Sequence, residues 1–172
     1  MPRERRTFQT PCSRTVTLPS RREDLPNVGY TGGDNGDYMQ HRNPFTYFTD
    51  GVNSPSELNN LVPFSQFASD LANNALPRFS YIVPNIQDDA HNGTLNQADS
   101  WLETNIAPLI TSSTFQQDGL LIITFDESFD TDTQNGGGQV PAVIISPKAE
   151  GTNPRRCIST RAYAGWCCRH WE

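Results

Sequence analysis

Long apolar runs are absent from this 172-residue sequence, and no stretch approaches the roughly 18 apolar residues that a membrane-spanning helix needs. We therefore predict no integral membrane segment. The early basic residues Arg3, Arg5 and Arg6 are not followed by an apolar block, so no secretory signal peptide is predicted. The low apolar content of 35%, with 13 prolines and 12 glycines, indicates one domain with long loops.

Basic residues are scarce in the middle of the chain. Residues 23–151 hold 17 of the 19 acidic residues but only three of the 13 basic ones, which are Arg42, Arg78 and Lys148. The net charge of −6 argues against a general nucleic-acid surface, and we predict no nucleic-acid partner. The charge distribution instead sets the two ends apart from the middle.

The two ends are basic and contain all four cysteines. Cys157, Cys167 and Cys168 lie near His170, but their spacing matches no regular zinc finger, and we expect no metal site there. We predict three segments: an irregular basic segment over 1–22, a folded domain over 23–151, and an atypical basic, cysteine-containing tail over 152–172.

The stretch 120–128, LLIITFDES, indicates a strand followed by an acidic loop. Its apolar run lacks polar alternation, which is typical of a central parallel strand covered on both faces. Asp126 and Glu127 follow that strand, where ligands bind in open α/β sheets, and paired carboxylates suit a divalent metal. The alternative is a solvated acidic loop, because Asp130 and Asp132 follow.

A second acidic loop follows a predicted strand at 79–83 and holds Asp88, Asp89 and His91. A carboxylate and an imidazole this close together can bind a metal or place a proton donor beside a leaving oxygen. The alternative is an Asx-rich turn that caps the next helix, with His91 on the surface. For another histidine, His41, the alternatives are a hydrogen-bonded structural residue and a ligand.

Apolar spacing predicts helices over 64–73 and 95–111, and Pro108 should bend or shorten the last turn of the second helix. Strands are predicted at 119–125 and 140–146. The order strand 79–83, helix 95–111, strand 119–125 predicts a βαβ unit with parallel pairing. Both acidic loops should then face the same edge of the sheet.

The middle of the chain resembles phosphoesterases of the acid phosphatase and phospholipase C type, within the alkaline-phosphatase-like superfamily. The resemblance is carried by motifs that occur in family order from about 23 to 151: EDLP (23–26), HRNPF (41–45), PNIQDDAHNGT (84–94), ADSWLETNIAPLI (98–110), GLLIITFDES (119–128), GGGQV (136–140) and VIISPKA (143–149).

The resemblance implies an α/β/α sandwich with a mainly parallel sheet, in which 23–151 is a partial phosphoesterase domain. It implies metal-dependent hydrolysis of a small-molecule or phospholipid phosphate ester, and family members are often secreted or periplasmic. Asp126 and Glu127 would bind a divalent metal. His91 and Asp89 would be catalytic, and Asp88 and His41 would contact substrate.

The chain departs from the family pattern before EDLP. The family's amino-terminal metal motif and the motif of its Ser or Thr nucleophile have no match in residues 1–22. This departure, with the atypical tail, favours a truncated or frame-disrupted reading frame. The alternative function is therefore an inactive fragment that binds a metal or phosphate weakly. A third hypothesis, a carbohydrate-binding module, requires Tyr38, Tyr47 and Trp101 on one exposed face.

Overall fold

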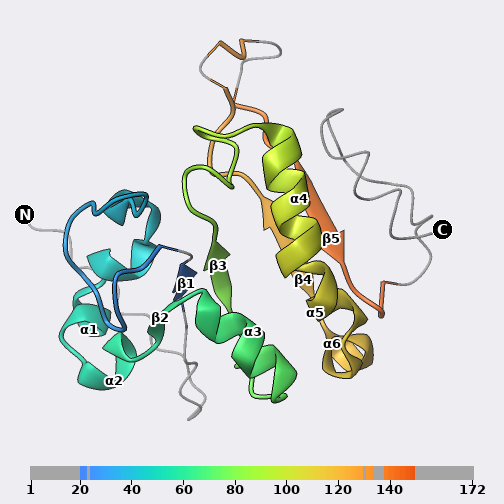
Figure 1. Ribbon diagram of the computed structural model, residues 1–172, viewed down its shortest axis with the longest axis horizontal. Helices are drawn as coiled ribbons and strands as arrows, with labels where there is room; N and C mark the ends of the chain where they lie inside the picture. Colours follow the sequence, from blue (N-terminus) through green and yellow to red (C-terminus); the bar gives the residue numbers. More distant parts are fainter. Residues whose placement is uncertain (1–19, 23, 130, 134–137, 150–172) are drawn as a thin grey trace, which may run out of the picture.

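The chain contains both helices and short strands, in keeping with an α/β protein (Figure 1). The computed structural model describes residues 20–22, 24–129, 131–133 and 138–149. The helical elements are η1 (Gln40–Arg42), η2 (Pro44–Tyr47), α1 (Thr49–Val52), α2 (Pro55–Leu58), α3 (Ser65–Ala72), α4 (Leu95–Asn105), α5 (Ala107–Thr111) and α6 (Ser113–Asp118). The strands are β1 (Ser20–Arg22), β2 (Leu61–Pro63), β3 (Tyr81–Val83), β4 (Leu121–Thr124) and β5 (Ala142–Ile145).

Three of the strands form a parallel sheet in the order β2-β1-β3. Strand β1 is central, and Ser20 is in register with Leu61 of β2 and Tyr81 of β3. This strand lies at the end of the segment 1–22, which the sequence analysis expected to be irregular. The sequence Ser-Arg-Arg carries no β-propensity, so the strand is held by backbone pairing to neighbours on both sides. The rest of that segment lies outside the described residues, as does the tail with Cys157, Cys167 and Cys168.

The other two strands, β4 and β5, form an antiparallel pair in which Ile122 is opposite Ile144. The predicted parallel pairing of the strands at 79–83 and 119–125 was wrong, because among the described strands β3 pairs with β1 and β4 pairs with β5. An apolar run is compatible with either pairing. An antiparallel neighbour needs no crossover helix, and β5 is the next described strand along the chain after β4.

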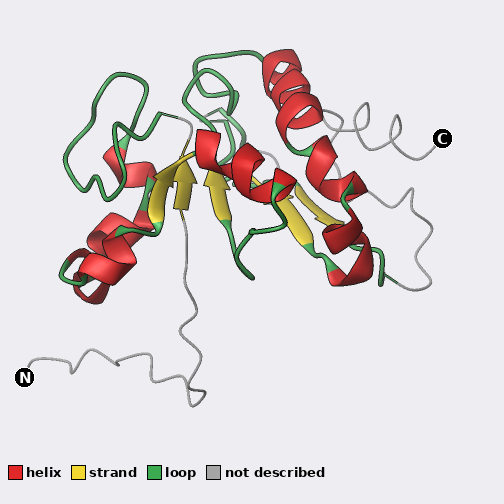
Figure 2. Cartoon of the chain, turned by 60° about the horizontal axis from the view of Figure 1, so that its bottom comes forward, coloured by secondary structure: helices red, strands yellow, loops and turns green. Residues whose placement is uncertain are grey.

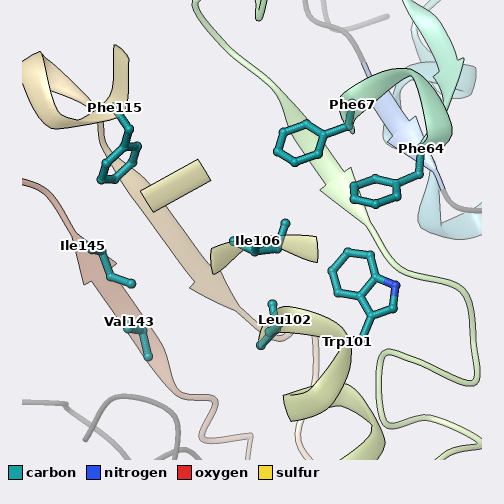
Figure 3. Close-up of a cluster of buried hydrophobic side chains, with 8 residues drawn as sticks. All are labelled: Phe64, Phe67, Trp101, Leu102, Ile106, Phe115, Val143 and Ile145. Atoms are coloured by element: carbon teal, nitrogen blue, oxygen red, sulfur yellow. The ribbon is translucent and has the colours of Figure 1, made fainter. Parts of the chain in front are cut away.

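The helices α3, α4, α5 and α6 lie on one face of the strands (Figure 2). This face carries the main core, in which aromatic and branched side chains from those helices meet β5 (Figure 3). Its buried members are Phe64, Phe67, Trp101, Leu102, Ile106, Phe115, Val143 and Ile145. The indole of Trp101 packs against Phe64 with ring centroids 5.1 Å apart, so this tryptophan is a packing residue.

The opposite face of the β4–β5 pair is exposed. Val143 and Ile145 are buried, whereas Ile122 and Ile144 are 58% and 66% exposed. Leu120 is also exposed. The prediction that the strand at 119–125 is covered on both faces was therefore wrong for the described residues: the helices cover one face only.

The predicted helices at 64–73 and 95–111 are confirmed, with one division. The second helix ends at Asn105, and α5 restarts at Ala107 with Pro108 in its first turn. Proline is tolerated there because the first turn lacks intrahelical acceptors for its amide groups, so the predicted effect of Pro108 is confirmed. Helix α6 was not predicted. No helix among the described residues is both long and apolar enough to cross a membrane.

A smaller cluster lies between the amino-terminal loops and β2. Its buried residues are Leu25, Tyr38 and Leu61, and Phe45 packs against them. The Phe45 ring also meets Tyr81 of β3 edge to face, with centroids 5.6 Å apart. This contact places η2 beside β3.

Candidate functional site

Two acidic loops leave the strands at the same end of the molecule. Strands β3 and β4 run in the same direction, and the loop after each lies at the top in Figure 1. The first loop spans 84–94 and the second begins at Phe125. The sequence predicted this common edge from a parallel pairing of the two strands. The two loops reach the same end without that pairing.

The loop 84–94 is ordered by a network around Asn85 and Asp88. Asn85 Oδ1 accepts hydrogen bonds from the backbone N–H groups of Gln87 (2.8 Å) and Asp88 (3.0 Å). The two carboxylate oxygens of Asp88 accept from Asn85 Nδ2 at 3.1 Å and from Gln97 Nε2 of α4 at 2.9 Å. Thr94 Oγ1 caps α4 by accepting from the Gln97 N–H at 3.1 Å. These bonds give Asp88 a role in shaping the loop and joining it to α4.

The carboxylate of Asp89 connects the same loop to η1. One oxygen, Oδ1, accepts the His91 backbone N–H at 2.8 Å, and the other forms an ion pair with the Arg42 guanidinium. Both side chains are largely buried, with exposures of 17% for Asp89 and 10% for Arg42. Between Asp89 and His91, Ala90 has a φ of +70°, a left-handed conformation that costs free energy for a residue with a Cβ. The Asp89 bonds hold the loop in this conformation.

The His91 imidazole is exposed, in contrast to the aspartates before it. Its Nδ1 lies 2.9 Å from Asn92 Oδ1. Because an amide oxygen only accepts hydrogen bonds, this contact fits a ring that carries its proton on Nδ1. The neutral ring then has a free lone pair on Nε2, and the protonated ring can donate from Nε2 to an anion. The ring is therefore available for acid–base chemistry.

Asp126 and Glu127 are both exposed at the end of β4. Neither carboxylate takes part in a hydrogen bond or ion pair within the described part of the chain. Their hard oxygen donors match divalent cations such as Mg²⁺ or Ca²⁺. Within the described ranges, however, no three His, Cys, Asp or Glu side chains come close enough together to hold a metal ion. Among the described residues, the pair by itself does not make up a metal site.

His41 lies on η1 and is exposed, next to the buried ion-pair residue Arg42. The structure thus brings Asp89 and His91 together but records no contact that joins them to Asp126, Glu127 or His41. Arg42 was not among the predicted site residues. The available indication was its rarity, because it is one of three basic residues in 23–151.

The carbohydrate-binding alternative does not agree with the burial of its aromatic residues. Tyr38 has no exposed surface and Trp101 is only 7% exposed, whereas Tyr47 is 61% exposed. The three rings therefore cannot form one binding face. The acidic loops remain as the candidate site.

Comparisons with known proteins agree in pointing to one family. The model of the Phosphoesterase family matches residues 16–155. The chain is 36% identical over 120 residues to a probable acid phosphatase of Kluyveromyces lactis, an alignment that covers 66% of this chain and 28% of that protein. It is 31% identical over 122 residues to an acid phosphatase of Aspergillus fumigatus, covering 67% of this chain and 27% of that protein.

A bacterial relative carries a more specific name. The chain is 33% identical over 122 residues to a phosphatidylinositol-3-phosphatase of Mycobacterium tuberculosis, covering 71% of this chain and 38% of that protein. The chain thus spans between about a quarter and two fifths of the length of these relatives. All three matches are to proteins named phosphatases.

Proposed function

This chain belongs to the phosphoesterase family, and on that premise we propose that the whole protein hydrolyses phosphate esters. The names of the relatives support a monoester as the substrate, since they are acid phosphatases and a phosphatidylinositol-3-phosphatase. A small-molecule or phospholipid monoester fits this class. The other candidate substrate is a phosphate diester, as in phospholipase C chemistry.

The observation that carries the proposal is an exposed imidazole on a hydrogen-bonded loop at the same end of the molecule as two exposed carboxylates. Asp89 holds the backbone of the loop at His91, while the His91 ring itself is exposed. Asp126 and Glu127 come shortly after β4 in the chain, and the carboxyl end of β4 lies at that end of the molecule (Figure 1). Phosphoryl transfer needs stabilisation of charge on non-bridging oxygens and a proton at the leaving oxygen. The His91 imidazole can supply the proton, and a cation held by the two carboxylates would supply the charge stabilisation.

In this proposal the His91 ring is the catalytic group of the described residues. Its protonated form donates from Nε2 to a phosphoryl or leaving oxygen, with Nδ1 held by Asn92. Asp89 supports catalysis by holding the loop backbone at His91, and Asp88 does so by tying the loop to α4. A substrate contact for Asp88 or His41 stays a prediction, and the exposed position of His41 on η1 leaves it accessible.

We also propose that the reaction depends on a divalent metal, with Asp126 and Glu127 as two of its ligands. A bound metal would supply charge stabilisation at the phosphoryl oxygens. In the whole protein we infer an α/β/α sandwich with a mainly parallel sheet. The parallel order β2-β1-β3 and the helices on one face support this architecture. The exposed face with Ile122 and Ile144 is where a second helical layer would pack.

The decisive experiment is an assay of the full chain on p-nitrophenyl phosphate and on bis-p-nitrophenyl phosphate. The protein is first stripped with EDTA and then supplied separately with Mg²⁺, Mn²⁺, Ca²⁺ or Zn²⁺. We expect turnover of the monoester with one of these metals, and a loss of about 100-fold or more in kcat for His91→Ala. Asp126→Asn and Glu127→Gln should weaken metal binding measured by calorimetry, whereas Asp118→Asn, an exposed change on α6, should not.

The alternative function, binding without turnover, is favoured by one feature of the sequence: residues 1–22 match no nucleophile motif. Calorimetry with inorganic phosphate separates the two functions. Phosphate binding that requires His91, with no turnover of either ester, would support the alternative. If the full chain neither binds phosphate nor hydrolyses an ester, both functions fail for this chain.

A further inference from the structure

The ion pair between Arg42 and Asp89 joins two segments that are 47 positions apart in the sequence. Arg42 is the last residue of η1, and Asp89 lies in the loop after β3. Both side chains are more than four fifths buried. Residues 23–151 contain only three basic residues, and the guanidinium of one of them, Arg42, is largely buried against the Asp89 carboxylate. The pair is therefore a specific link between η1 and the loop 84–94.

Hydrogen bonds fix the residues on both sides of Arg42. The backbone N–H of Gln40, at the start of η1, donates to Asp34 Oδ1 at 2.8 Å. The Gln40 side chain also donates, from Nε2 to the backbone carbonyl oxygen of Thr31 at 3.2 Å. After Arg42, Asn43 is fully buried and its Nδ2 donates to the Tyr38 hydroxyl at 3.4 Å. Contacts on both sides of Arg42 thus keep it in place. A shift of the loop relative to η1 would separate the two charges.

Asp89 transmits this restraint to His91. Its Oδ2 faces Arg42 while its Oδ1 accepts the His91 N–H, so one carboxylate spans both contacts. The left-handed Ala90 between them means that the loop would relax if the carboxylate were released. The position of the His91 backbone, and therefore of its ring, depends on the pair.

A purely stabilising role would leave one feature of Arg42 unexplained. Its Nε is buried and has no hydrogen-bond partner among the described residues. A buried donor without a partner opposes folding, and such groups in native proteins need an explanation. A role in holding the loop explains why a guanidinium is kept here, where an apolar side chain would avoid that cost.

We propose that Arg42 is a positioning residue that holds His91 in place through Asp89. This inference rests on the proposed function, in which His91 contacts the phosphoryl group. Small displacements of such a group can cost large factors in binding and rate. Loss of either partner of the pair should therefore weaken phosphate binding, even though neither Arg42 nor Asp89 needs to touch the phosphate.

The test measures phosphate binding and stability separately in the full chain. Inorganic phosphate is titrated while the imidazole resonance of His91 is followed by NMR, with its assignment taken from His91→Ala. The variants are Arg42→Gln, Arg42→Lys, Asp89→Asn and the double variant Arg42→Gln/Asp89→Asn. Arg78→Gln and Glu103→Gln remove one charge of each sign at exposed positions and serve as matched controls. Urea unfolding of every variant gives the folded fraction.

We expect each single neutral variant to weaken phosphate binding about tenfold, and the double variant to be no weaker than the singles, because both act through one link. Arg42→Lys, which keeps the charge, should recover part of the affinity, and both controls should bind within about twofold of the unaltered chain.

Equal phosphate affinity in the unaltered chain and in the folded fraction of Arg42→Gln and Asp89→Asn would overturn the inference, even if both were less stable. Should Arg42→Gln fail to fold, Asp89→Asn and Arg42→Lys decide the question. The absence of any phosphate-dependent shift of His91 in the unaltered chain would instead count against the proposed function of this site.

Discussion

Single residues in the loop 84–94 are constrained by close packing as well as by hydrogen bonds. A Cβ at Gly93 would overlap the Gln87 carbonyl oxygen and would lie 2.9 Å from Gln97 Oε1. Both neighbours belong to the network that orders the loop. Since the φ of Gly93 is outside the left-handed region, glycine is needed here for space and not for backbone conformation.

We therefore expect Gly93→Ala to lower the free energy of unfolding by about 1–3 kcal/mol, the range for overpacked sites. Gly33→Ala is the matched control, because nothing lies within 4 Å of its Cβ position. Its effect should stay below about 0.5 kcal/mol. Urea denaturation of both variants makes the comparison. Equal free energies of unfolding for the two variants would show that the loop accommodates a Cβ at Gly93 without cost, contrary to this prediction.

The sequence located the acidic loops and their histidine but not the arginine that binds one of them. Asp88, Asp89 and His91 lie within four positions, so their proximity can be read directly. The roles of the two aspartates depend on Gln97 and Arg42, which approach from other elements. Such pairing between distant segments leaves no periodic pattern in the sequence. Only the three-dimensional arrangement distinguishes a loop-shaping carboxylate from a free one.

At the scale of elements, local patterns were reliable for helices and less so for strand pairing. The buried positions of α4, which are Ala98, Trp101 and Leu102, follow the helical repeat. Pro108 marked the division between α4 and α5. The strand partners of β3 and β4 could not be read, because an apolar run shows that a segment is suited to burial and does not identify its neighbour. Helix α6 is too short for its pattern to be distinctive.

The start of α4 gives a test at this scale. Thr94 Oγ1 accepts the Gln97 N–H, so Thr94→Ala should lower the free energy of unfolding by about 1 kcal/mol through loss of the cap. Thr104→Ala, an exposed change inside the same helix, should be neutral or slightly stabilising, because alanine has the highest helix propensity. Urea unfolding followed by circular dichroism measures both. A Thr94→Ala variant as stable as Thr104→Ala would mean that the cap bond contributes nothing.

At the scale of the whole molecule, the distribution of apolar side chains is uneven. The main core gathers on the helical face of the strands, and the other face of β4–β5 presents Ile122 opposite Ile144 to solvent. The apolar run 120–124 predicted a strand covered on both faces, but Ile122 is 58% exposed. The run could not indicate whether anything covers the second face, because that depends on residues elsewhere. An exposed pair of strands with such a face invites association with other chains.

This uneven distribution predicts that the 172-residue chain self-associates through the β4–β5 face. The double variant Ile122→Thr/Ile144→Thr should reduce binding of a hydrophobic dye and concentration-dependent association in light scattering. Threonine keeps the β-propensity of the strands, so stability should change by less than about 1 kcal/mol. Val143→Thr, at the adjacent buried position, should instead cost more than about 1 kcal/mol, because it buries a hydroxyl. A monodisperse, cooperatively unfolding monomer of the unaltered chain, with dye binding equal to that of the double variant, would refute the prediction.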